Sequence, residues 1–507
     1  MTYLLGADVG TSSCKVVLIN THGDTVATSR VSYQTSYPHT NWAEQDPEEW
    51  YYNFCLAVRQ CIQRASVPAS AIRAVSVCGP AHDVVLLDQH GRALQPVILW
   101  SDRRSTPQAQ LLEELYGDLI LDTSYQPVSP HWTLAQLLWI KEYQPEIWQQ
   151  ITRLAIRKDY ICYRLTGSWA TDWYDAVGTQ LFDVEQGTWS EMLCDMIGLP
   201  MSYLPPVRDA TSISGCVTPQ SSEATGLAIG TTVAVGSGDS VVEALGAGVF
   251  EPGQGIIKLS TSGSVSVVTA TPHPNDKTIT YHHLVPQRWY SIAATNSGAA
   301  AAQWFVDVFG RAPVSGNLDK IAAQAEPGNL GLIFHPYLQG ERAPHWDPYL
   351  RSDFVGITIQ HQQKHFARAV LEGVAFSLRD CFELFHSLDI HIHEFYVLGG
   401  GARSPLWRQI IADIFGRNLI ETPYVNLAAY GAALLAGVAQ GTFANFDEAV
   451  HVGKRQQTIT EPNPKTAPLY AELYTLYQRL TTSLAPIYHD LSVLMTEETT
   501  NELVETS

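Results

Sequence analysis

Gly6-Ala7-Asp8-Val9-Gly10-Thr11 and Gly236-Ser237-Gly238-Asp239-Ser240 are the two stretches that decide how this chain folds. Each is an apolar, strand-like run that ends in glycines around one aspartate. Neither Asp8 nor Asp239 has a nearby basic residue in the sequence that would make it an ordinary surface ion pair. We therefore expect a cleft between two halves of the chain, with one carboxylate for a metal-bound phosphate and one for a proton.

The composition narrows the class of protein. A chain of 507 residues, 45% of them hydrophobic, is long enough for two domains with large cores. The net charge of −19 argues against nucleic acid or an anionic membrane as a partner, although a nucleotide needs only local donors. No apolar run approaches a membrane-spanning length, and the eight cysteines include no Cys-x-x-Cys pair. With no leader pattern before the first strand, we expect reduced thiols and a cytoplasmic location.

A strand, a polar glycine turn and a second strand occur twice along the chain. Residues 3–7 and 14–19 form the first such pattern, and residues 256–259 and 265–268 form the second. Other expected elements are strands at 25–32, 72–77 and 232–235 and helices at 47–64, 106–116, 133–143, 158–166, 364–387, 405–416 and 427–440. We place the domain boundary near 247–253, which divides the chain into 1–248, 249–490 and an acidic tail, 491–507, whose end we expect to fray.

Residues 8–15 fit a hairpin that holds phosphates. Neither the P-loop pattern nor Gly-x-Gly-x-x-Gly occurs, so the two commonest phosphate motifs are excluded. Gly10 allows close backbone approach, while Thr11, Ser12 and Ser13 offer hydroxyl and N–H donors. Lys15 can meet a terminal phosphate, and Asp8 is suited to hold Mg²⁺ through water. An ordinary glycine turn capped by Asp8 is the alternative.

Three further elements carry candidate chemistry. Thr261-Ser262-Gly263-Ser264 is a second phosphate cradle or a simple Ser/Thr-rich hairpin turn. Gly399-Gly400-Gly401-Ala402-Arg403-Ser404 joins a strand to a helix, where glycines admit a flat ring or a phosphate; tight strand–helix packing is the alternative. Asp239 can accept a proton from a sugar hydroxyl during phosphoryl transfer, or cap the following helix, and both can hold.

An ordered set of motifs resembles the FGGY carbohydrate kinases, and among these the xylulokinases, over roughly residues 3–485. Besides the turns at Asp8–Lys15, Gly238-Asp239, Thr261–Gly263 and Gly399–Ala402, the set includes Glu44-Gln45-Asp46-Pro47, Trp100-Ser101-Asp102-Arg103, Lys158-Asp159-Tyr160, Pro336–Pro344 and the signature around Ser352–Ile357 and His365–Glu372. The resemblance implies two actin-like (ribonuclease H-like) α/β domains with an interdomain catalytic cleft. It also implies ATP and Mg²⁺ as reactants.

The resemblance assigns a role to individual residues. Asp239 becomes the general base and Asp8 the carboxylate at the Mg²⁺–phosphate site. On the nucleotide side it places Gly10, Thr11, Ser12, Lys15, Thr261 and Ser262 at phosphates, and Gly298, Gln303, Gly400, Gly401 and Ala402 at the rest of the nucleotide. His82 matches the sugar-contacting histidine, and we expect Ala81, Trp100, Asp102 and Ser240 beside it. Residues 1–248 would then form the sugar and phosphate side, and 249–490 the nucleotide side.

The chain departs from the family pattern at three places. Where xylulokinases usually read Gly-Gln-Met-His-Gly, this chain has Gly79-Pro80-Ala81-His82-Asp83. Pro80 stiffens the loop, Ala81 removes a long side chain, and Asp83 adds a charge. The pocket is therefore expected to be wider or to bind another polyol. Gln136 replaces a common lysine. The common Leu-Gly-Ala-Ala near the C-terminus appears as Ala429-Tyr430-Gly431-Ala432-Ala433, where Tyr430 could alter nucleotide packing. The resemblance assigns no role to Glu341 or Arg342, and Asp102 with Arg103 could orient substrate or form a buried ion pair.

The sequence therefore predicts an ATP-dependent sugar kinase that converts D-xylulose to D-xylulose 5-phosphate. The alternatives are a kinase of the same family for another ketopentose, a sugar acid or a polyol, and an actin-like ATPase switch that phosphorylates no sugar. The expected partners are small molecules, with a homodimer as one oligomeric state to test.

Overall fold

A computed structural model describes residues 2–309, 318–422, 425–452 and 457–505. Its contacts group into two compact units. Unit 1 comprises residues 1–251, 270–290 and 424–455, and unit 2 comprises residues 252–269, 291–423 and 456–507. The first break, after Glu251, falls within the expected boundary region, but the sequence did not indicate that two later segments join unit 1. No helix in the described ranges has the length and apolarity needed to span a bilayer.

Unit 1 is built on a mixed sheet in which β13, β14, β5, β1, β2 and β3 follow one another and β15 pairs with β5. The strands of this sheet are β1 (Tyr3–Val9), β2 (Ser13–Asn20), β3 (Thr25–Ser32), β5 (Ile72–Gly79), β13 (Ile213–Cys216), β14 (Thr232–Ala234) and β15 (Ser237–Gly238). Its helices are α1 (Pro47–Ala65), α2 (Thr106–Ser124), α3 (Thr133–Tyr143), α4 (Pro145–Trp148), α5 (Arg157–Thr166), α6 (Trp173–Gly178), α7 (Glu191–Ile197), α8 (Pro219–Thr225), α9 (Asp239–Ala247), α14 (Leu427–Ala439) and α15 (Phe446–Val452). Shorter strands are β4 (Glu44–Gln45), β6 (Val84–Leu87), β7 (Val97–Ile98), β8 (Arg153–Ile156), β9 (Thr171–Asp172), β10 (Phe182–Asp183), β11 (Thr188–Trp189), β12 (Val207–Arg208) and β18 (Ile279–His282).

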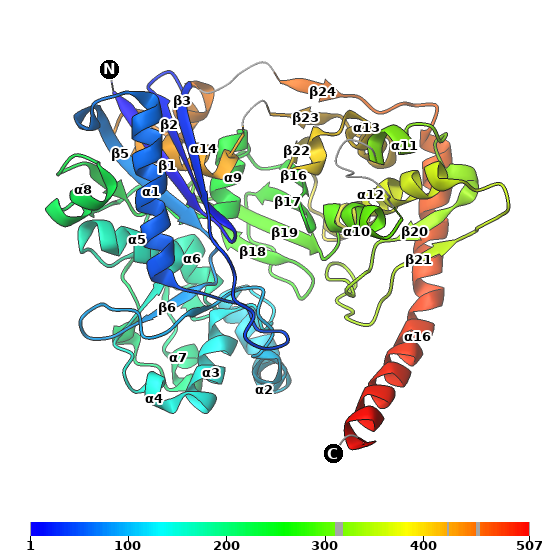
Figure 1. The fold of residues 1–507 in the computed structure, drawn as a ribbon, viewed down its shortest axis with the longest axis horizontal. Helices are drawn as coiled ribbons and strands as arrows, with labels where there is room; N and C mark the ends of the chain where they lie inside the picture. Colours follow the sequence, from blue (N-terminus) through cyan, green and yellow to red (C-terminus); the bar gives the residue numbers. More distant parts are fainter. Residues whose placement is uncertain (1, 310–317, 423–424, 453–456, 506–507) are drawn as a thin grey trace. The chain divides into compact units, whose positions relative to one another are not determined.

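Helices cover both faces of the sheet of unit 1, since β1 presents small or apolar residues to each face. Leu5, Ala7 and Val9 join the core under α1, drawn in blue in Figure 1. Gly6 points the other way, and a Cβ there would lie 2.0 Å from Ala429 O of α14. A larger residue at position 6 would therefore push α14 off the sheet.

In unit 2, β19, β17, β16, β22, β23 and β24 lie side by side in this order. Its strands are β16 (Gln254–Leu259), β17 (Gly263–Thr269), β19 (Trp289–Thr295), β20 (Ile333–His335), β21 (Asp353–Val355), β22 (Glu394–Leu398), β23 (Leu419–Glu421) and β24 (Thr458–Thr460). Its helices are α10 (Ala299–Phe309), α11 (Leu318–Ala322), α12 (Gln363–Ser387), α13 (Pro405–Phe415) and α16 (Ala467–Glu505). Val370, Val374 and Leu378 of α12 are buried in the core of this unit, and Phe366 and Phe382 pack against it.

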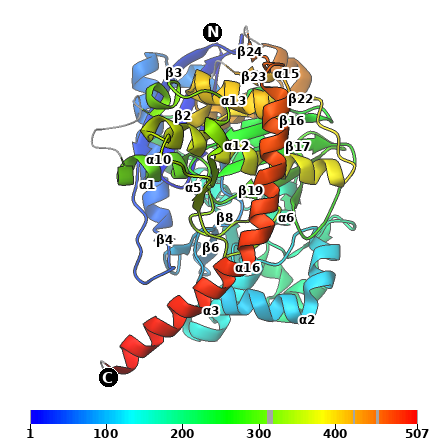
Figure 2. The same ribbon diagram turned by 90° about the vertical axis from the view of Figure 1, so that its right-hand side faces the viewer.

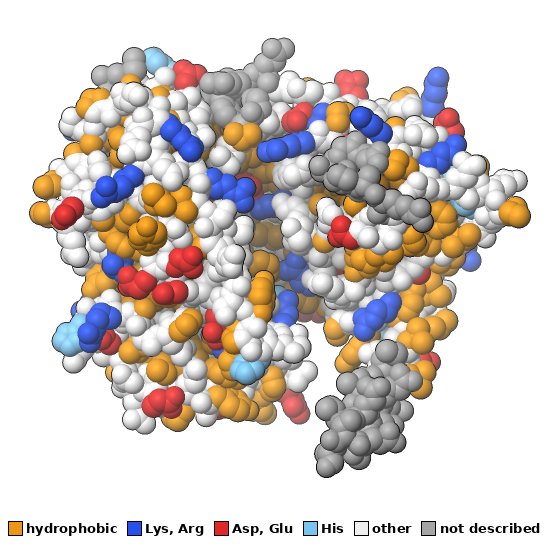
Figure 3. Space-filling model, viewed as in Figure 1, with side chains coloured by type: hydrophobic (Ala, Val, Ile, Leu, Met, Phe, Trp, Pro, Cys, Tyr) orange, Lys and Arg blue, Asp and Glu red, His pale blue; other side chains and the backbone are white. Residues whose placement is uncertain are grey.

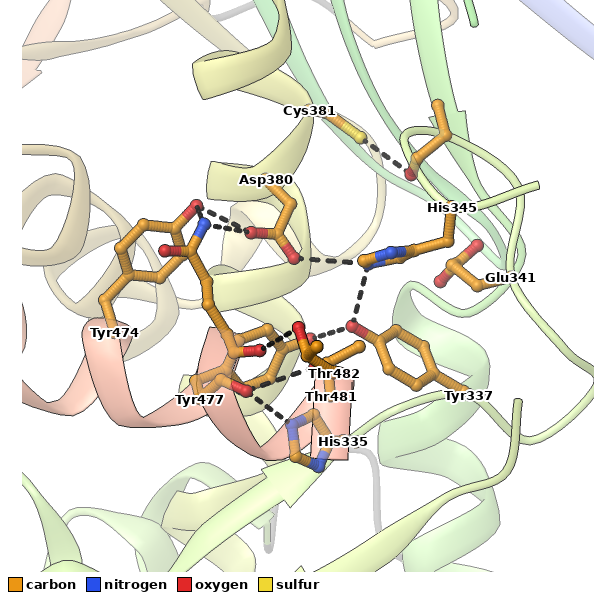
Figure 4. Close-up of polar contacts among 12 residues, drawn as sticks. His335, Tyr337, Glu341, His345, Asp380, Cys381, Tyr474, Tyr477, Thr481 and Thr482 are labelled. Atoms are coloured by element: carbon orange, nitrogen blue, oxygen red, sulfur yellow. Dashed lines mark hydrogen bonds and ion pairs between the residues drawn. The ribbon is translucent and has the colours of Figure 1, made fainter. Parts of the chain in front are cut away.

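Helix α16, red in Figure 2, was not expected from the sequence. Figure 4 shows that its tyrosines enter a polar cluster: Tyr477 Oη lies 2.7 Å from Tyr337 Oη, and Tyr474 donates to Asp380 at 2.6 Å. Further along, Ile487 and Leu491 are exposed, and hydrophobic side chains are visible at the surface in Figure 3. The helix continues to Glu505, so most of the segment expected to fray is helical instead.

Candidate active site

The turn between β1 and β2 carries Asp8. The antiparallel register places Lys15 directly opposite Asp8, and Lys15 Nζ lies 2.9 Å from Asp8 Oδ2. The charge of Asp8 raises the pKa of Lys15. The expectation that Asp8 lacks a basic neighbour is therefore wrong, because the turn brings together residues seven positions apart. Lys15 is 30% exposed at its side chain, so its ammonium remains within reach of an anion.

A buried arginine holds this turn. Gly10 O accepts hydrogen bonds from Arg157 at 2.7 Å and from the Tyr33 hydroxyl. Arg157 also donates to Asp83 Oδ2 at 2.5 Å and lies 3.9 Å from the ring centroid of Trp50. Asp83 is fully buried, so the expectation that it adds a charge to the pocket is wrong. Its charge is instead paired with the arginine that anchors the turn at Gly10.

Asp239 is the first residue of α9, and Gly238 is the N-cap. The expectation that Asp239 is itself the N-cap is therefore wrong, although the helix N-terminus still favours its negative charge. Ser240 Oγ donates to Asp239 Oδ1 at 3.2 Å. Asp239 is partly exposed, as a group that accepts a proton from a ligand must be.

Helix α14 fixes the elements that carry the two aspartates. It meets β1 at Gly6 and α9 at Gly431, where a Cβ would lie 2.0 Å from Val242 O. Only glycine allows these backbones to approach so closely. Tyr430 is buried, and its hydroxyl donates to Gly23 O at 3.0 Å. Tyr430 thereby secures the turn after β2, and its expected effect on nucleotide packing stays a prediction.

His82 lies in an aromatic cluster. Its Nδ1 is 2.9 Å from Gly178 O, and because a carbonyl only accepts, Nδ1 carries the proton. Nε2 then accepts from the Tyr281 hydroxyl at 3.1 Å. Burial lowers the pKa of His82 to about 4, so the ring is neutral at pH 7. Trp132 meets the His82 ring edge-on at 4.4 Å, so it is both a core residue and a wall of this cluster.

Tyr281 and Tyr174 connect this cluster to Asp239. Their rings stack at 4.1 Å, and a Cβ on Gly238 would lie 2.2 Å from Tyr174. Burial raises the pKa of both phenols, and the charge of Asp239 adds to it, which places Asp239 near both rings. Sequence reasoning missed both tyrosines, because no local pattern shows that Tyr174 of α6 and Tyr281 of β18 meet in the folded chain.

The remaining residues expected on the sugar side divide into two groups. Ala81 is buried next to His82 in the chain, whereas the Trp100 indole donates to Thr11 Oγ1 of the turn after β1 at 3.2 Å. Asp102 is buried and binds Arg104 at 2.8 Å, while its Oδ2 also accepts from Ala43 N. Of the two roles considered for Asp102, the structure shows the ion pair, with Arg104 in place of Arg103. Gln136 donates to Leu99 O at 3.3 Å and is likewise buried.

In unit 2, the turn between β16 and β17 packs against the start of α10. Thr261 O accepts from Gly298 N at 3.0 Å, and Ser260 O accepts from Ala299 N at 2.7 Å. A Cβ on Gly298 would lie 2.6 Å from the backbone of Ser262, so only glycine fits. Thr261 is exposed and Ser262 partly so, which leaves their hydroxyls accessible.

A cavity of about 460 Å³ adjoins Gly400, a size typical of ligand sites. Its lining is formed by Ala299, Ala302, Gln303, Val306, Leu318, Asp319, Gly400, Gly401, Arg403, Ser404 and Trp407. Gly400 has open space where a Cβ would lie, so a flat group can approach its backbone. Ala402 is buried and absent from this lining, because it points into the protein. Asp319 and Trp407 were missed, since neither belongs to a glycine turn.

Glu341 and Arg342 support the strand that leads to α10. Glu341 Oε1 accepts from Asn296 N at 2.6 Å, and Arg342 donates to Thr295 O at 2.9 Å. Burial raises the pKa of Glu341 to about 7. These side chains therefore hold the backbone just before Gly298.

Comparison with known proteins decides the family. Models of the FGGY family of carbohydrate kinases match residues 3–246 (N-terminal domain) and 255–440 (C-terminal domain). The chain belongs to the FGGY family of carbohydrate kinases. The expected pair of α/β domains is thereby confirmed, and so is the expectation of a sugar kinase.

Individual members of the FGGY family resemble the chain over almost its full length. A xylulose kinase of Bacillus subtilis is 32% identical over 95% of this chain and 97% of its own. The structure of a xylulose kinase from Rhodospirillum rubrum is similar with a TM-score of 0.88 and 29% identity, covering 96% of this chain and 100% of the other. A gluconate kinase from Lactobacillus acidophilus has a TM-score of 0.91 and 26% identity, with 97% and 99% covered. The family alone therefore does not decide the sugar.

Proposed function

We propose that this chain transfers the γ-phosphoryl group of ATP to the terminal hydroxyl of D-xylulose, giving D-xylulose 5-phosphate. Asp239 accepts the proton of that hydroxyl as its oxygen attacks phosphorus. The observation that carries the proposal is the placement of Asp239 at the start of α9, partly exposed and adjoining the His82–Tyr281–Tyr174 cluster.

Each unit, taken by itself, contains residues suited to parts of a nucleotide. In unit 1, the amides and hydroxyls of Gly10, Thr11 and Ser12, with Lys15, suit the phosphates. In unit 2, Thr261 and Ser262 suit phosphates, and the cavity at Gly400 suits the adenosine. Gln303 and Gly401 line the same cavity.

The donor set fits Mg²⁺. No group of three or more potential metal-binding side chains occurs among the described residues, but Mg²⁺ commonly uses one or two carboxylates together with substrate phosphates and water. Asp8, at the end of β1, is the carboxylate that would hold it. When bound, the ion would neutralise charge on the phosphates.

A neutral sugar is favoured by the chemistry around His82. The ring is neutral, and Asp239 nearby is acidic. His82 Nε2 can only accept, and a sugar hydroxyl would bind it in exchange for the Tyr281 hydroxyl. Such a site suits hydroxyl donors better than the carboxylate of a sugar acid, which would want a cation. The gluconate kinase among the similar structures nevertheless makes a sugar acid the second candidate.

A coupled assay of ADP release across D-xylulose, other ketopentoses, polyols and D-gluconate tests the proposal. We expect the highest kcat/KM for D-xylulose and little turnover of D-gluconate. A higher kcat/KM for D-gluconate would contradict D-xylulose as the substrate and make the chain a sugar-acid kinase. If no sugar accelerated ADP release, the ATPase switch would be favoured. The homodimer and the cytoplasmic location stay predictions, to be tested by sedimentation and by fractionation of cells.

A further inference from the structure

A buried cluster of charges lies behind the sugar side of unit 1. Lys158 Nζ is 2.6, 3.0 and 3.1 Å from carboxylate oxygens of Asp159, Asp172 and Asp175. All four side chains are at most 3% exposed. Burying one cation among three carboxylates has a large desolvation cost, so such a cluster is poor evidence for added stability. A role in positioning other residues accounts for it better.

Lys158 fastens α6 to α5. Asp172 is the N-cap of α6 and accepts from Tyr174 N at 3.2 Å, while Asp175 lies in the first turn. Lys158 belongs to α5 and contacts both carboxylates. Lys158 therefore ties the start of α6 to the neighbouring helix.

From α6, two contacts lead to Asp239. Ser237 Oγ donates to Asp172 Oδ2 at 2.6 Å. Tyr174 fills the space beside Gly238, where it leaves no room for a Cβ. Since Ser237 and Gly238 directly precede Asp239, both contacts fix the backbone that presents its carboxylate.

The other end of α6 leads to His82. Gly178, the last residue of α6, accepts from His82 Nδ1 at 2.9 Å and so selects the tautomer of the ring. A Cβ on Gly178 would lie 3.0 Å from the Ala81 side chain, which shows how closely the two segments pack.

We propose that Lys158 is a positioning residue which, through α6, fixes both Asp239 and His82. The inference rests on the proposed function, since it assigns proton acceptance to Asp239 and sugar contact to His82. The two ends of α6 should influence different kinetic constants. The Ser237 contact acts on Asp239 and hence on kcat, whereas the Gly178 contact acts on His82 and hence on the KM for the sugar.

Ser237→Ala tests the Asp239 branch. Ser29→Ala is the matched control, because Ser29 is also buried in unit 1 and also donates a 2.6 Å hydrogen bond, to Ala57 O of α1. We expect Ser237→Ala to lower kcat on the order of 10- to 100-fold, as displacements of a reacting group do, with both KM values unchanged. Ser29→Ala should keep the wild-type kcat. Equal kcat in the two variants would overturn the inference.

Asp172→Asn tests the junction with Lys158 while keeping the shape of the side chain. The amide has one acceptor oxygen where the carboxylate has two, so either Lys158 Nζ or the pair Tyr174 N and Ser237 Oγ loses its acceptor, and α6 should shift at both ends. We expect a lower kcat and a higher KM for the sugar, with the KM for ATP unchanged. An equal change in the KM for ATP would indicate a general structural defect and overturn the inference. Failure of the proposed function would appear separately, as inactivity of wild type and Ser29→Ala toward every sugar.

Discussion

Replacing Gly431 by alanine should displace the residue proposed as the base without touching it. A Cβ at position 431 would lie 2.0 Å from Val242 O of α9, whereas packed atoms stay at least about 3 Å apart, so α9 must move by about 1 Å. Overpacking of this kind lowers the free energy of unfolding by about 1–3 kcal/mol, and the higher helix propensity of alanine offsets about 1 kcal/mol of this loss. A shift of about 1 Å in a reacting group can lower the rate about 100-fold.

Gly437→Ala is the control, because it lies in the same helix and the atoms nearest to its Cβ would be side-chain atoms of Phe443 and Leu4, with no backbone atom of α9 among them. Steady-state turnover with D-xylulose and urea unfolding would be measured on both variants. We expect kcat to fall about 100-fold in Gly431→Ala and less than threefold in Gly437→Ala. A Gly431→Ala enzyme with wild-type kcat would refute the view that α14 sets the position of Asp239.

Three further outcomes follow from single contacts. Gly400 has a helical backbone conformation and open space at its Cβ, so Gly400→Val should add a side chain to the cavity without loss of stability. The KM for ATP should then rise about tenfold or more, and an unchanged KM would place the nucleotide elsewhere. Asp83→Asn leaves Arg157 buried and unpaired, so urea unfolding should show a loss of about 3–5 kcal/mol, and a loss below about 1 kcal/mol would contradict the pairing. The pKa of Glu341 is about 7 in the folded state and near 4.5 in the unfolded chain. As the pH rises from 4.5 to 7, the free energy of unfolding of wild type should therefore fall by up to about 3 kcal/mol relative to Glu341→Gln. Parallel stability curves of the two proteins from pH 5 to pH 8 would show that the carboxyl is not buried as described.

Local patterns allowed much of the fold to be predicted. The helix expected at 133–143 is α3 itself, and the strands around Asp8 differ by at most two residues at their ends. These elements have strong periodicity and clear turn residues. Helix α16 was missed because its apolar and polar residues are mixed and a proline, which usually ends a helix, lies inside it.

Within the site, residues in glycine turns were predictable, whereas their partners were not. Lys15 lies opposite Asp8 only because of the strand register, and Asp83 is neutralised by an arginine far along the chain. Tyr281 reaches His82 across almost two hundred residues. Pairings of this kind depend on the tertiary fold, so no window of sequence shows them.

Turnover of Asp239→Asn tests the central claim most directly. ADP release with D-xylulose and ATP binding by titration would be measured on this variant, on wild type and on Asp195→Asn, an exposed aspartate of α7 in the same unit. We predict that Asp239→Asn loses about 10²–10⁴-fold in kcat while its Kd for ATP stays within about threefold of wild type, and that Asp195→Asn behaves as wild type. Near-normal turnover of Asp239→Asn would contradict the assignment of Asp239 as the proton acceptor.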